Sequence, residues 1–365
     1  MPYIIGLGAL TAPLMLRAAP PAAVESSAGM VVTAQHLASE AGAEILRLGG
    51  NAVDAAVAVG YALAVTHPCC GNLGGGGFMT IRMADGREVF INFREKAPLA
   101  ARADMYLDAH GNPIAAKSID GYLAAGVPGT VLGLETARRR YGTMDRPALM
   151  AAAIRLAEDG FVLTRGDTDV LGAETKAFRK QPNVAATFLH SGQPLEPGDR
   201  LVQKNLAATL RAISERGPDV FYRGPIADAV AAASKANGGL LTRRDFESYD
   251  VTESAPIRCR YRGFTVLSAP PPSSGGVTLC EMLEVLEGYP LGELGFHSAR
   301  SVHYLAEAMR FAYHDRNMYL GDPAFVRNPV ERLLSPANVA EIRAHIHPDG
   351  ATPSSSLGAV TASDE

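Results

Sequence analysis

The sequence predicts a layered domain of the α/β or α+β class. Segments with the alternating pattern of β-strands lie near the front of the chain, at 78–93, and near its back, at 258–270, and helical segments lie between them. The chain has 365 residues, of which 47% are hydrophobic and 20% are charged. This composition suffices for one large core or two smaller cores, and neither a repeat nor an interdomain linker interrupts the pattern.

The first twenty residues, MPYIIGLGALTAPLMLRAAP, are mostly apolar but contain glycines and Pro13. This stretch is too short and too interrupted to span a membrane, and it is about as long as the core of an export signal. Small residues follow it, whereas no lysine or arginine precedes Arg17. We therefore expect residues 1–28 to be an N-terminal arm or the remnant of an export signal, which implies a periplasmic or secreted protein without a membrane span.

The first structural unit is expected to be a short strand at 30–36 followed by a helix at 37–48. Apolar residues recur on one face of this helix, and a glycine pair ends it. Asn51 can cap the next helix, at 52–67, together with Asp54 three positions later. This second helix carries Ala, Val and Gly on nearly every side, so we expect it to be buried all round.

Four consecutive glycines at 74–77 raise the question of a phosphate-binding loop. Such a loop needs a strand before the glycines and a helix N-terminus after them. Here a helix precedes the glycines, and two alternating runs follow, at 78–83 and 88–93, joined by the turn sequence ADGR. The glycines are therefore predicted to form a tight, side-chain-free entry into a central strand, where helix and sheet backbones nearly touch.

The remainder of the chain is predicted to be mostly helical. Helices are expected at 147–160, twice within 205–239, at 277–289 and at 301–320, and a turn-rich segment at 270–276 follows the last strand-like segment.

The charge of the chain excludes one class of partner. The formal net charge is −4, and no stripe rich in lysine or arginine is present. A nucleic-acid partner is therefore not expected.

The four cysteines, Cys69, Cys70, Cys259 and Cys280, do not have the spacing of a metal site or of a disulfide framework. The first two are adjacent, so a bond between them would be strained. All four are interpreted as small buried side chains, and no metal site is predicted.

The histidines show no metal-binding or catalytic arrangement. His345 and His347 are the nearest pair, and two donors without a third make a weak metal site. His303 and His314 fall on one predicted helix, about three turns apart, which is too far to share a ligand.

A nucleophile is also missing. Ser273 and Ser274 lack the frame of a nucleophile elbow and are interpreted as turn residues. Asp315, Arg316 and Asp322 have no paired partner in the sequence and are interpreted as structural. No catalytic residue is therefore assigned in this chain.

Arg94 is the best candidate for a binding residue. It stands with Glu95 at the end of an alternating strand, where a hairpin delivers polar groups to a cleft. The planar guanidinium fork binds a carboxylate through two parallel hydrogen bonds. From these residues alone, a salt bridge with one of the 38 acidic residues is the competing interpretation.

The assembled motifs resemble the N-terminal part of γ-glutamyltranspeptidase precursors, which are N-terminal nucleophile hydrolases. The resemblance runs from about residue 29 to about residue 325. In chain order the motifs are GGNAVDAAVAVGYAL, GNLGGGGFM, NFREKAP, GVPGTVLGLE, AIRLAEDGF, APPPSSGG and YLGDP.

This resemblance implies an α+β fold, the four-layer αββα sandwich, of which this chain is the large-subunit part. The family's precursor cuts itself before a threonine, and the large and small subunits stay associated. Residues 29–345 would then be the large-subunit domain, and residues 346–365 a flexible tail that ends at the autocleavage site. The nucleophilic threonine would be the first residue of the small subunit, which is the implied partner.

The resemblance also implies the chemistry. The arginine of the family's FRE motif, which is Arg94 here, binds the α-carboxylate of a γ-glutamyl donor such as glutathione or glutamine. The small subunit supplies the α-amino contacts and the oxyanion donors. The threonine forms a γ-glutamyl ester, which passes to water or to an amino-acid or peptide acceptor, and no metal or organic cofactor is implied.

Two alternatives remain open at this point. Relatives with the same architecture hydrolyse the glutaryl side chains of cephalosporins, and a noncatalytic module could hold an amino acid through Arg94. Whether the encoded precursor continues beyond Glu365 into a threonine-led segment distinguishes the second alternative. The pair Cys69-Cys70 has no assigned role.

Overall fold

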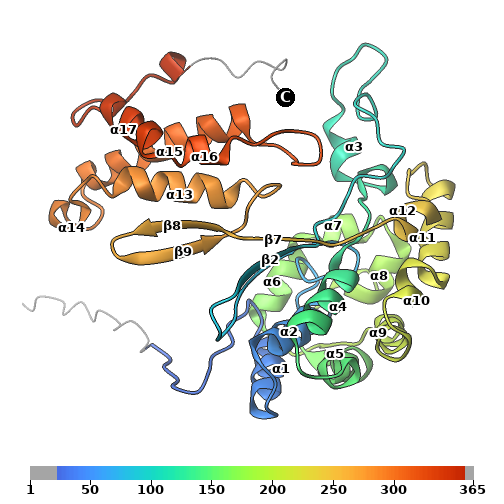
Figure 1. Ribbon diagram of the computed structural model, residues 1–365. Helices are drawn as coiled ribbons and strands as arrows, with labels where there is room; N and C mark the ends of the chain where they lie inside the picture. The colour runs from blue at the N-terminus through green and yellow to red at the C-terminus, as the bar shows by residue number, and fades with distance from the viewer. Residues whose placement is uncertain (1–22, 358–365) are drawn as a thin grey trace, which may run out of the picture.

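The computed structural model describes residues 23–357, and its elements form two lobes joined through a central layer of strands (Figure 1). The N-terminal lobe, residues 36–254, and the C-terminal lobe, residues 257–357, each have a hydrophobic cluster of their own. The export-signal prediction for 1–28 falls largely on residues outside the described range, as does the autocleavage site expected at the end of the chain.

The elements of the N-terminal lobe are α1 (His36–Arg47), α2 (Ala52–Thr66), β1 (Phe78–Arg82), β2 (Glu88–Asn92), α3 (Ala115–Ile119), η1 (Tyr122–Ala124), α4 (Thr130–Tyr141), α5 (Arg146–Asp159), β3 (Phe161–Val162), α6 (Arg165–Ala173), α7 (Thr175–Phe178), α8 (Pro182–Phe188), β4 (Leu189–His190), β5 (Gln193–Pro194), β6 (Arg200–Leu201), α9 (Lys204–Arg216), α10 (Asp219–Tyr222), α11 (Pro225–Ala236), α12 (Arg243–Glu247) and β7 (Thr252–Ser254). Those of the C-terminal lobe are β8 (Ile257–Tyr261), β9 (Phe264–Ser268), α13 (Gly275–Leu286), α14 (Leu291–Leu294), α15 (Ala299–Tyr319), α16 (Val330–Leu333), α17 (Pro336–His345) and η2 (Ser354–Leu357).

The main sheet is antiparallel, with the strand order β1-β2-β7. The β1–β2 hairpin is closed by the predicted turn, in which Gly86 has a φ of +88° and the Arg87 amide donates to Asp85 Oδ1 at 3.0 Å. The glycines enter β1, which the sequence predicts to be a central strand. Within residues 23–357, however, β1 is the edge strand and β2 is the central one, because β7 pairs with β2 and not with β1.

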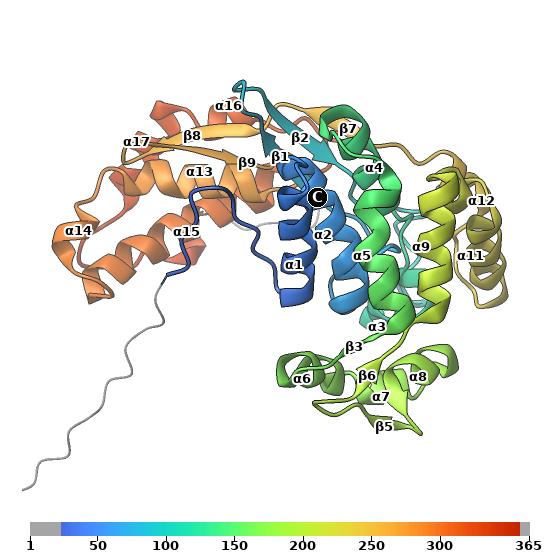
Figure 2. The same ribbon diagram turned by 90° about the horizontal axis from the view of Figure 1, so that it is seen from below.

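Helices cover the strands from two sides. In Figure 1, α13, α15 and α17 lie on one face of the β8–β9 hairpin, whereas α1, α2, α4 and α5 lie on the other side of the molecule, below the main sheet. Figure 2 shows α1, α2, α5, α9 and α11 side by side as one helical layer. Ile91, Phe93 and Val131 belong to the hydrophobic cluster that joins this layer to the sheet.

The first two helices form as predicted. Asn51 Oδ1 accepts from the amides of Val53 and Asp54, and the Asp54 carboxylate accepts in return from the Asn51 amide, which completes a capping box. Helix α2 is mostly buried, as its apolar composition predicts. The fully buried Asp54 also accepts from the amides of Thr143 and Met144, so it fixes the start of α2 to the α4–α5 loop.

Four other local predictions need correction. Residues 30–36 are not a strand, because no segment within residues 23–357 pairs with them. The segment 258–270 is not one strand but most of a hairpin, since Arg262 and Gly263 make a turn between β8 and β9. The glycine–proline pairs in 205–239 leave room for a short third helix, α10, and the helix expected at 301–320 begins two residues earlier.

The prediction that all four cysteines are simple buried side chains is wrong. Cys259 in β8 and Cys280 in α13 are buried, and they form a disulfide that ties the hairpin to the helix above it. Cys69 and Cys70 are exposed free thiols. The spacing gave no indication of the disulfide because its two ends are 21 positions apart and meet only through the fold.

The first part of the expected flexible tail packs against the C-terminal lobe. Ile346 is buried, the His303 ring contacts the His347 carbonyl at 2.6 Å, and the Thr352 amide donates to Glu307 Oε2 at 3.1 Å. Leu357 packs on the same cluster. Residues 346–357 therefore belong to the lobe, in contrast to the prediction of a loose tail from residue 346.

Within residues 23–357, no helix combines the length and the apolar character that crossing a lipid bilayer requires.

Candidate substrate-binding site

Arg94 lies two residues beyond the end of β2, and its backbone is held on both sides. Its amide donates to Asn92 Oδ1 at 3.0 Å. Its carbonyl accepts from the hydroxyl of Tyr249 at 2.9 Å, a residue just before β7. The end of the central strand is therefore fixed to the strand that pairs with it, and the arginine projects from a rigid base.

The guanidinium of Arg94 is exposed and is not neutralised by an acid within residues 23–357. Its Cζ atom lies 5.8 Å from the ring centroid of Phe78, so the guanidinium makes a cation–π contact with that ring. The nearby Lys96 differs, because it pairs with Asp250 and lies over the Tyr249 ring. The salt-bridge interpretation of Arg94 is thus not supported, and its fork is available to an external carboxylate.

The glycine run packs directly against the residues that carry Arg94. A Cβ at Gly76 would lie 2.5 Å from the Phe93 carbonyl oxygen, and one at Gly77 would lie 2.9 Å from the Phe93 ring. A Cβ at Gly75 would meet the Asn72 side chain at 2.8 Å, whereas Gly74 faces open space. The order of helix, glycines and hairpin is as predicted. The predicted close approach to backbone is confirmed at Gly76, whereas Gly75 and Gly77 face side chains and Gly74 faces open space.

A second set of glycines, in the motif GVPGTVLGLE, seats the start of α4 on the same strand end. The amides of Gly129 and Thr130 donate to the Gly75 carbonyl at 2.7 and 3.1 Å. Side chains at Gly129 or Gly133 would overlap Phe93. Neither the support from these glycines nor the Tyr249 hydrogen bond was found from the sequence, because the segments are far apart along the chain.

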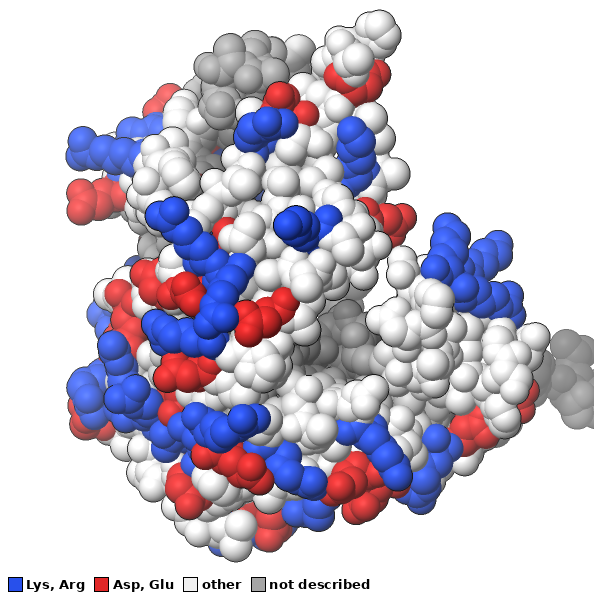
Figure 3. Space-filling view, turned by 90° about the vertical axis from the view of Figure 1, so that its right-hand side faces the viewer, with Lys and Arg blue, Asp and Glu red and all other residues white. Residues whose placement is uncertain are grey.

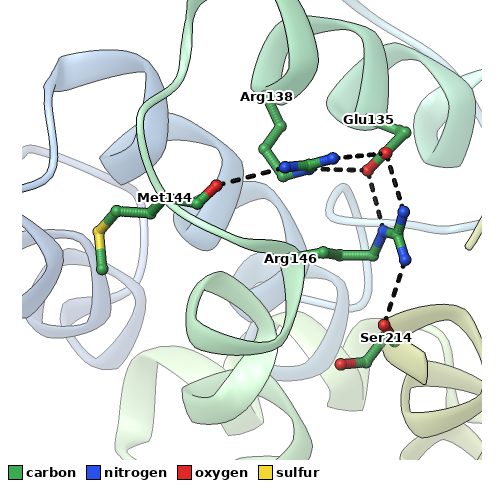
Figure 4. A network of polar contacts seen from close by, with 5 residues as sticks. All are labelled: Glu135, Arg138, Met144, Arg146 and Ser214. Atoms are coloured by element: carbon green, nitrogen blue, oxygen red, sulfur yellow. Dashed lines mark hydrogen bonds and ion pairs between the residues drawn. The ribbon is translucent and has the colours of Figure 1, made fainter.

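Helix α4 is anchored in turn by a buried ionic network (Figure 4). Glu135 accepts two hydrogen bonds from Arg138 and two from Arg146, all between 2.8 and 3.0 Å, and Arg146 also donates to the Ser214 carbonyl at 3.2 Å. Burial alone would raise the pKa of Glu135, but the two guanidinium groups lower that pKa to about 2. The network joins α4, α5 and α9 into one support for the site.

Charges of both signs are mixed on one face of the molecule (Figure 3). Figure 3 shows Lys and Arg interspersed with Asp and Glu over one face of the molecule. This mixture agrees with the near-balance of acidic and basic residues in the sequence, whose formal net charge is −4.

The serines proposed as turn residues lie in a turn and contact no base. Ser274 Oγ accepts from Arg316 Nε at 2.9 Å, and Ser273 Oγ accepts from the Gly275 amide at 3.2 Å. Asp322 Oδ1 accepts from the Ala324 amide at 2.9 Å, as expected for a structural residue. Both serines therefore make local structural hydrogen bonds.

Two histidines that the sequence analysis considered as metal ligands, His303 and His345, contact backbone carbonyls. His345 is the last residue of α17 and contacts the carbonyl of Glu341, and His303 contacts the carbonyl of His347. Within residues 23–357, the three metal-ligand side chains that do come together are His67, Cys69 and Cys70. Burial and the neighbouring Cys70 thiol raise the pKa of Cys69 to about 11, so Cys69 is not an activated nucleophile at neutral pH.

The arrangement of two helical layers about strands occurs in solved proteins. A crystal structure of a γ-glutamyltranspeptidase from Helicobacter pylori superposes with a TM-score of 0.90 and 42% identity, covering 93% of this chain and 99% of that one. The fold is therefore the α+β fold of N-terminal nucleophile hydrolases, as the motifs imply. The family model described as Gamma-glutamyltranspeptidase matches residues 38–364, and the chain belongs to this family.

Curated relatives agree with this assignment. A glutathione hydrolase proenzyme from Pseudomonas sp. (strain A14) is 59% identical over 337 residues, which are 92% of this chain and 59% of the relative. An acylase ACY 1 proenzyme from Pseudomonas sp. (strain V22) is 43% identical over 326 residues, 88% of this chain and 58% of the relative. The chain thus spans about three fifths of the length of these relatives.

Proposed function

We propose that this chain is the large subunit of an enzyme that hydrolyses or transfers the γ-glutamyl groups of glutathione, glutamine and related compounds, and that Arg94 binds the α-carboxylate of the donor. The observation that carries the proposal is an exposed guanidinium on a rigid strand end without an acidic partner in the described residues. A planar fork in this state binds a carboxylate through two charge-assisted hydrogen bonds.

The partner in this proposal is a small subunit that begins with the nucleophilic threonine. Two surfaces support its existence. The edge strand β1 has an unpaired side among the described residues, and α15 carries four apolar side chains at helical spacing, Val302, Leu305, Met309 and Tyr313, each between 40% and 48% exposed. An interface that covers both surfaces is expected to be obligate and to bury more than about 2,000 Å².

The proposed reaction places the chemistry on the partner and the orientation of the donor on this chain. The threonine hydroxyl attacks the γ-carbonyl carbon, and the threonine's own amino group takes the hydroxyl proton. The tetrahedral intermediate collapses to a γ-glutamyl ester as the leaving amine receives that proton. Water or an acceptor amine then attacks the ester, and Arg94 keeps the glutamyl group in one orientation throughout.

The first prediction tests Arg94 directly. The substitution Arg94→Lys keeps the charge but removes the two-pronged geometry, so kcat/KM for a γ-glutamyl anilide should fall by the equivalent of about 2–4 kcal/mol, mainly through KM. The measurement is steady-state hydrolysis by the full-length gene product. Arg87→Lys is the matched control, because Arg87 lies on the same hairpin and pairs with Asp85. Unchanged kinetics in the Arg94 variant would show that this arginine does not bind the donor.

The glutaryl-acylase alternative has its own support in the acylase relative. Arg94 cannot separate the two activities, because a glutaryl group also ends in a carboxylate that the fork can bind. A γ-glutamyl group differs by its α-amino group. Comparing kcat/KM for matched γ-glutamyl and glutaryl anilides therefore decides between them, and we expect the γ-glutamyl compound to be preferred.

Export to the periplasm or the medium is the remaining part of the proposal. The disulfide between Cys259 and Cys280 supports it, because disulfides persist mainly in oxidising compartments. Fractionation of the host cells, with detection of the protein in each fraction, tests this localisation.

A further inference from the structure

The turn that follows α2 brings three metal-ligand side chains together. The amides of Cys70 and Gly71 both donate to the His67 carbonyl, at 3.1 and 2.8 Å, so the chain folds back over the end of the helix. Residue 71 must be glycine, because a Cβ there would overlap the Leu63 carbonyl. The positions of the histidine and the two cysteines are therefore fixed by the backbone.

The donor atoms are already close to one another. The Cys69 sulfur lies 3.3 Å from His67 Nε2 and 2.8 Å from the Cys70 sulfur, and all three donors lie within 4.8 Å of each other. Bonds of about 2.3 Å to sulfur and about 2.0 Å to nitrogen around a tetrahedral ion separate neighbouring donors by about 3.5–3.8 Å. Both thiols are exposed, so side-chain rotation alone provides the small separation that an ion needs.

The donor set also defines the kind of ion. Two thiolates and an imidazole suit thiophilic cations, whereas magnesium and calcium prefer oxygen ligands. Three protein ligands leave one position of a tetrahedral ion for water or an external ligand.

We propose that His67, Cys69 and Cys70 form a three-ligand surface site for a thiophilic cation, zinc(II) or copper(I). Binding replaces two S–H bonds by two metal–sulfur bonds and releases two protons to the solvent. No electron is transferred, and the imidazole binds through its neutral nitrogen Nε2.

The site is connected to the glycine run through one side chain. Asn72 Nδ2 donates to the Cys70 carbonyl at 3.2 Å, and Asn72 Oδ1 accepts from the Gly75 amide and the Thr130 hydroxyl, both at 2.8 Å. An ion held by this turn therefore stiffens a segment that packs beneath the end of β2. The site itself needs neither Arg94 nor a partner chain, so it stands independently of the proposed function.

The test is metal binding by the full-length gene product, reduced and freed of metal under nitrogen. Zinc(II) and copper(I) are titrated separately against a competing chelator, and proton release is measured in the zinc titration. We expect one equivalent to bind, with two protons released per zinc ion. Cobalt(II) in place of zinc should give a thiolate-to-metal charge-transfer absorption.

Three variants locate the site. The double substitution Cys69→Ser/Cys70→Ser should weaken binding at least about 100-fold, and His67→Gln at least about 10-fold, because losing a direct ligand costs no less than the 10–100-fold typical of outer partners. His190→Gln, at an exposed histidine in β4, should leave the affinity unchanged. The ion with the lower dissociation constant, zinc(II) or copper(I), is the preferred ion.

Two results would overturn the proposal. One is a reduced protein that binds neither ion, or binds it equally well after the cysteines or His67 are replaced. The other is a Cys69–Cys70 disulfide that persists after reduction and blocks both sulfurs, which intact-protein mass spectrometry detects.

Discussion

The two lobes bury their apolar side chains to very different extents. The N-terminal lobe closes a continuous core that reaches from Ile45 to Tyr249, with α2 buried in its middle. The core of the C-terminal lobe is much smaller, and α15 leaves a row of apolar side chains exposed above it. The lobe that carries Arg94 thus has the larger core and leaves the edge of β1 unpaired among the described residues, whereas the other lobe leaves apolar side chains of α15 exposed.

The lobes also treat buried carboxyl groups differently. In the N-terminal lobe, Glu135 is held by two arginines and stays ionised. In the C-terminal lobe, the buried Glu281 lies beside Asp315 and accepts a hydrogen bond from the Asn338 amide at 3.0 Å. Burial and the neighbouring Asp315 raise the pKa of Glu281 to about 9, so this carboxyl is neutral at pH 7.

The largest expected effect of a single substitution concerns the ionic network. Glu135→Gln leaves Arg138 and Arg146 partly buried without a counter-charge, which should lower the free energy of unfolding by about 3–5 kcal/mol. Denaturant unfolding measures this loss. The control is Glu158→Gln, which breaks an exposed pair with Arg211 and should cost less than about 1 kcal/mol. Equal effects of the two substitutions would mean that the N-terminal lobe does not depend on this network.

The disulfide should matter for the C-terminal lobe alone. Replacing Cys259 and Cys280 together by alanine removes a cross-link over 21 positions and should destabilise this lobe by about 3 kcal/mol. Amide hydrogen exchange should then increase in β8, β9 and α13 and stay unchanged in α2. Loss of protection in both lobes would contradict the separation of the two cores.

A smaller effect is expected at the glycine run. Gly76→Ala places a methyl group against the Phe93 carbonyl and should cost about 1–3 kcal/mol, lowering stability without a selective loss of donor affinity. Gly74→Ala is the matched control, because nothing lies within 4 Å of its Cβ. Thermal unfolding and KM are measured for both. A Gly76 variant that unfolds normally but binds the donor poorly would assign the glycines to the substrate.

The smallest expected effect is a pH dependence of stability that Glu281 causes, because its pKa is raised whereas that of Glu135 is lowered. Unfolded Glu281 loses its proton near its ordinary pKa of 4.5, whereas the folded residue keeps it up to about pH 9. Its contribution to stability is therefore complete below pH 4.5 and is lost as the pH rises towards 9. Glu281→Gln should remove this dependence and stabilise the protein by about 1–2 kcal/mol at pH 8. The free energy of unfolding is measured for the wild type and the Glu281→Gln variant from pH 5 to pH 9. If both free energies change with pH by the same amount, the raised pKa of Glu281 is refuted.

Local patterns predicted the elements whose signals lie within a few residues. The capping box at Asn51, the hairpin turn at Gly86 and the helix–glycine–hairpin order all depend on neighbours in the sequence, and the structure contains each of them. The segment 30–36 failed because its apolar residues satisfy the strand pattern, whereas a strand also needs a pairing partner that the pattern cannot specify.

The candidate site shows the same division. The position of Arg94 at a strand end followed from the alternation of β2, but its environment depends on Tyr249, which lies 155 residues away along the chain. The disulfide was missed for a similar reason, whereas the His67 cluster is local in the sequence and was missed because it depends on the conformation of one turn. Cys259 and Cys280 meet through tertiary packing, and the cluster forms because a turn folds two adjacent cysteines back over a helix end.

The strand order β1-β2-β7 has a consequence for how the chain is made. The second edge of β2 is completed only by β7, which follows about 160 residues later (252 − 92). At a synthesis rate of 5–20 residues per second, roughly 10–30 s pass between the two strands leaving the ribosome. During that time the β1–β2 hairpin has an open backbone edge on β2 with which another nascent chain can pair.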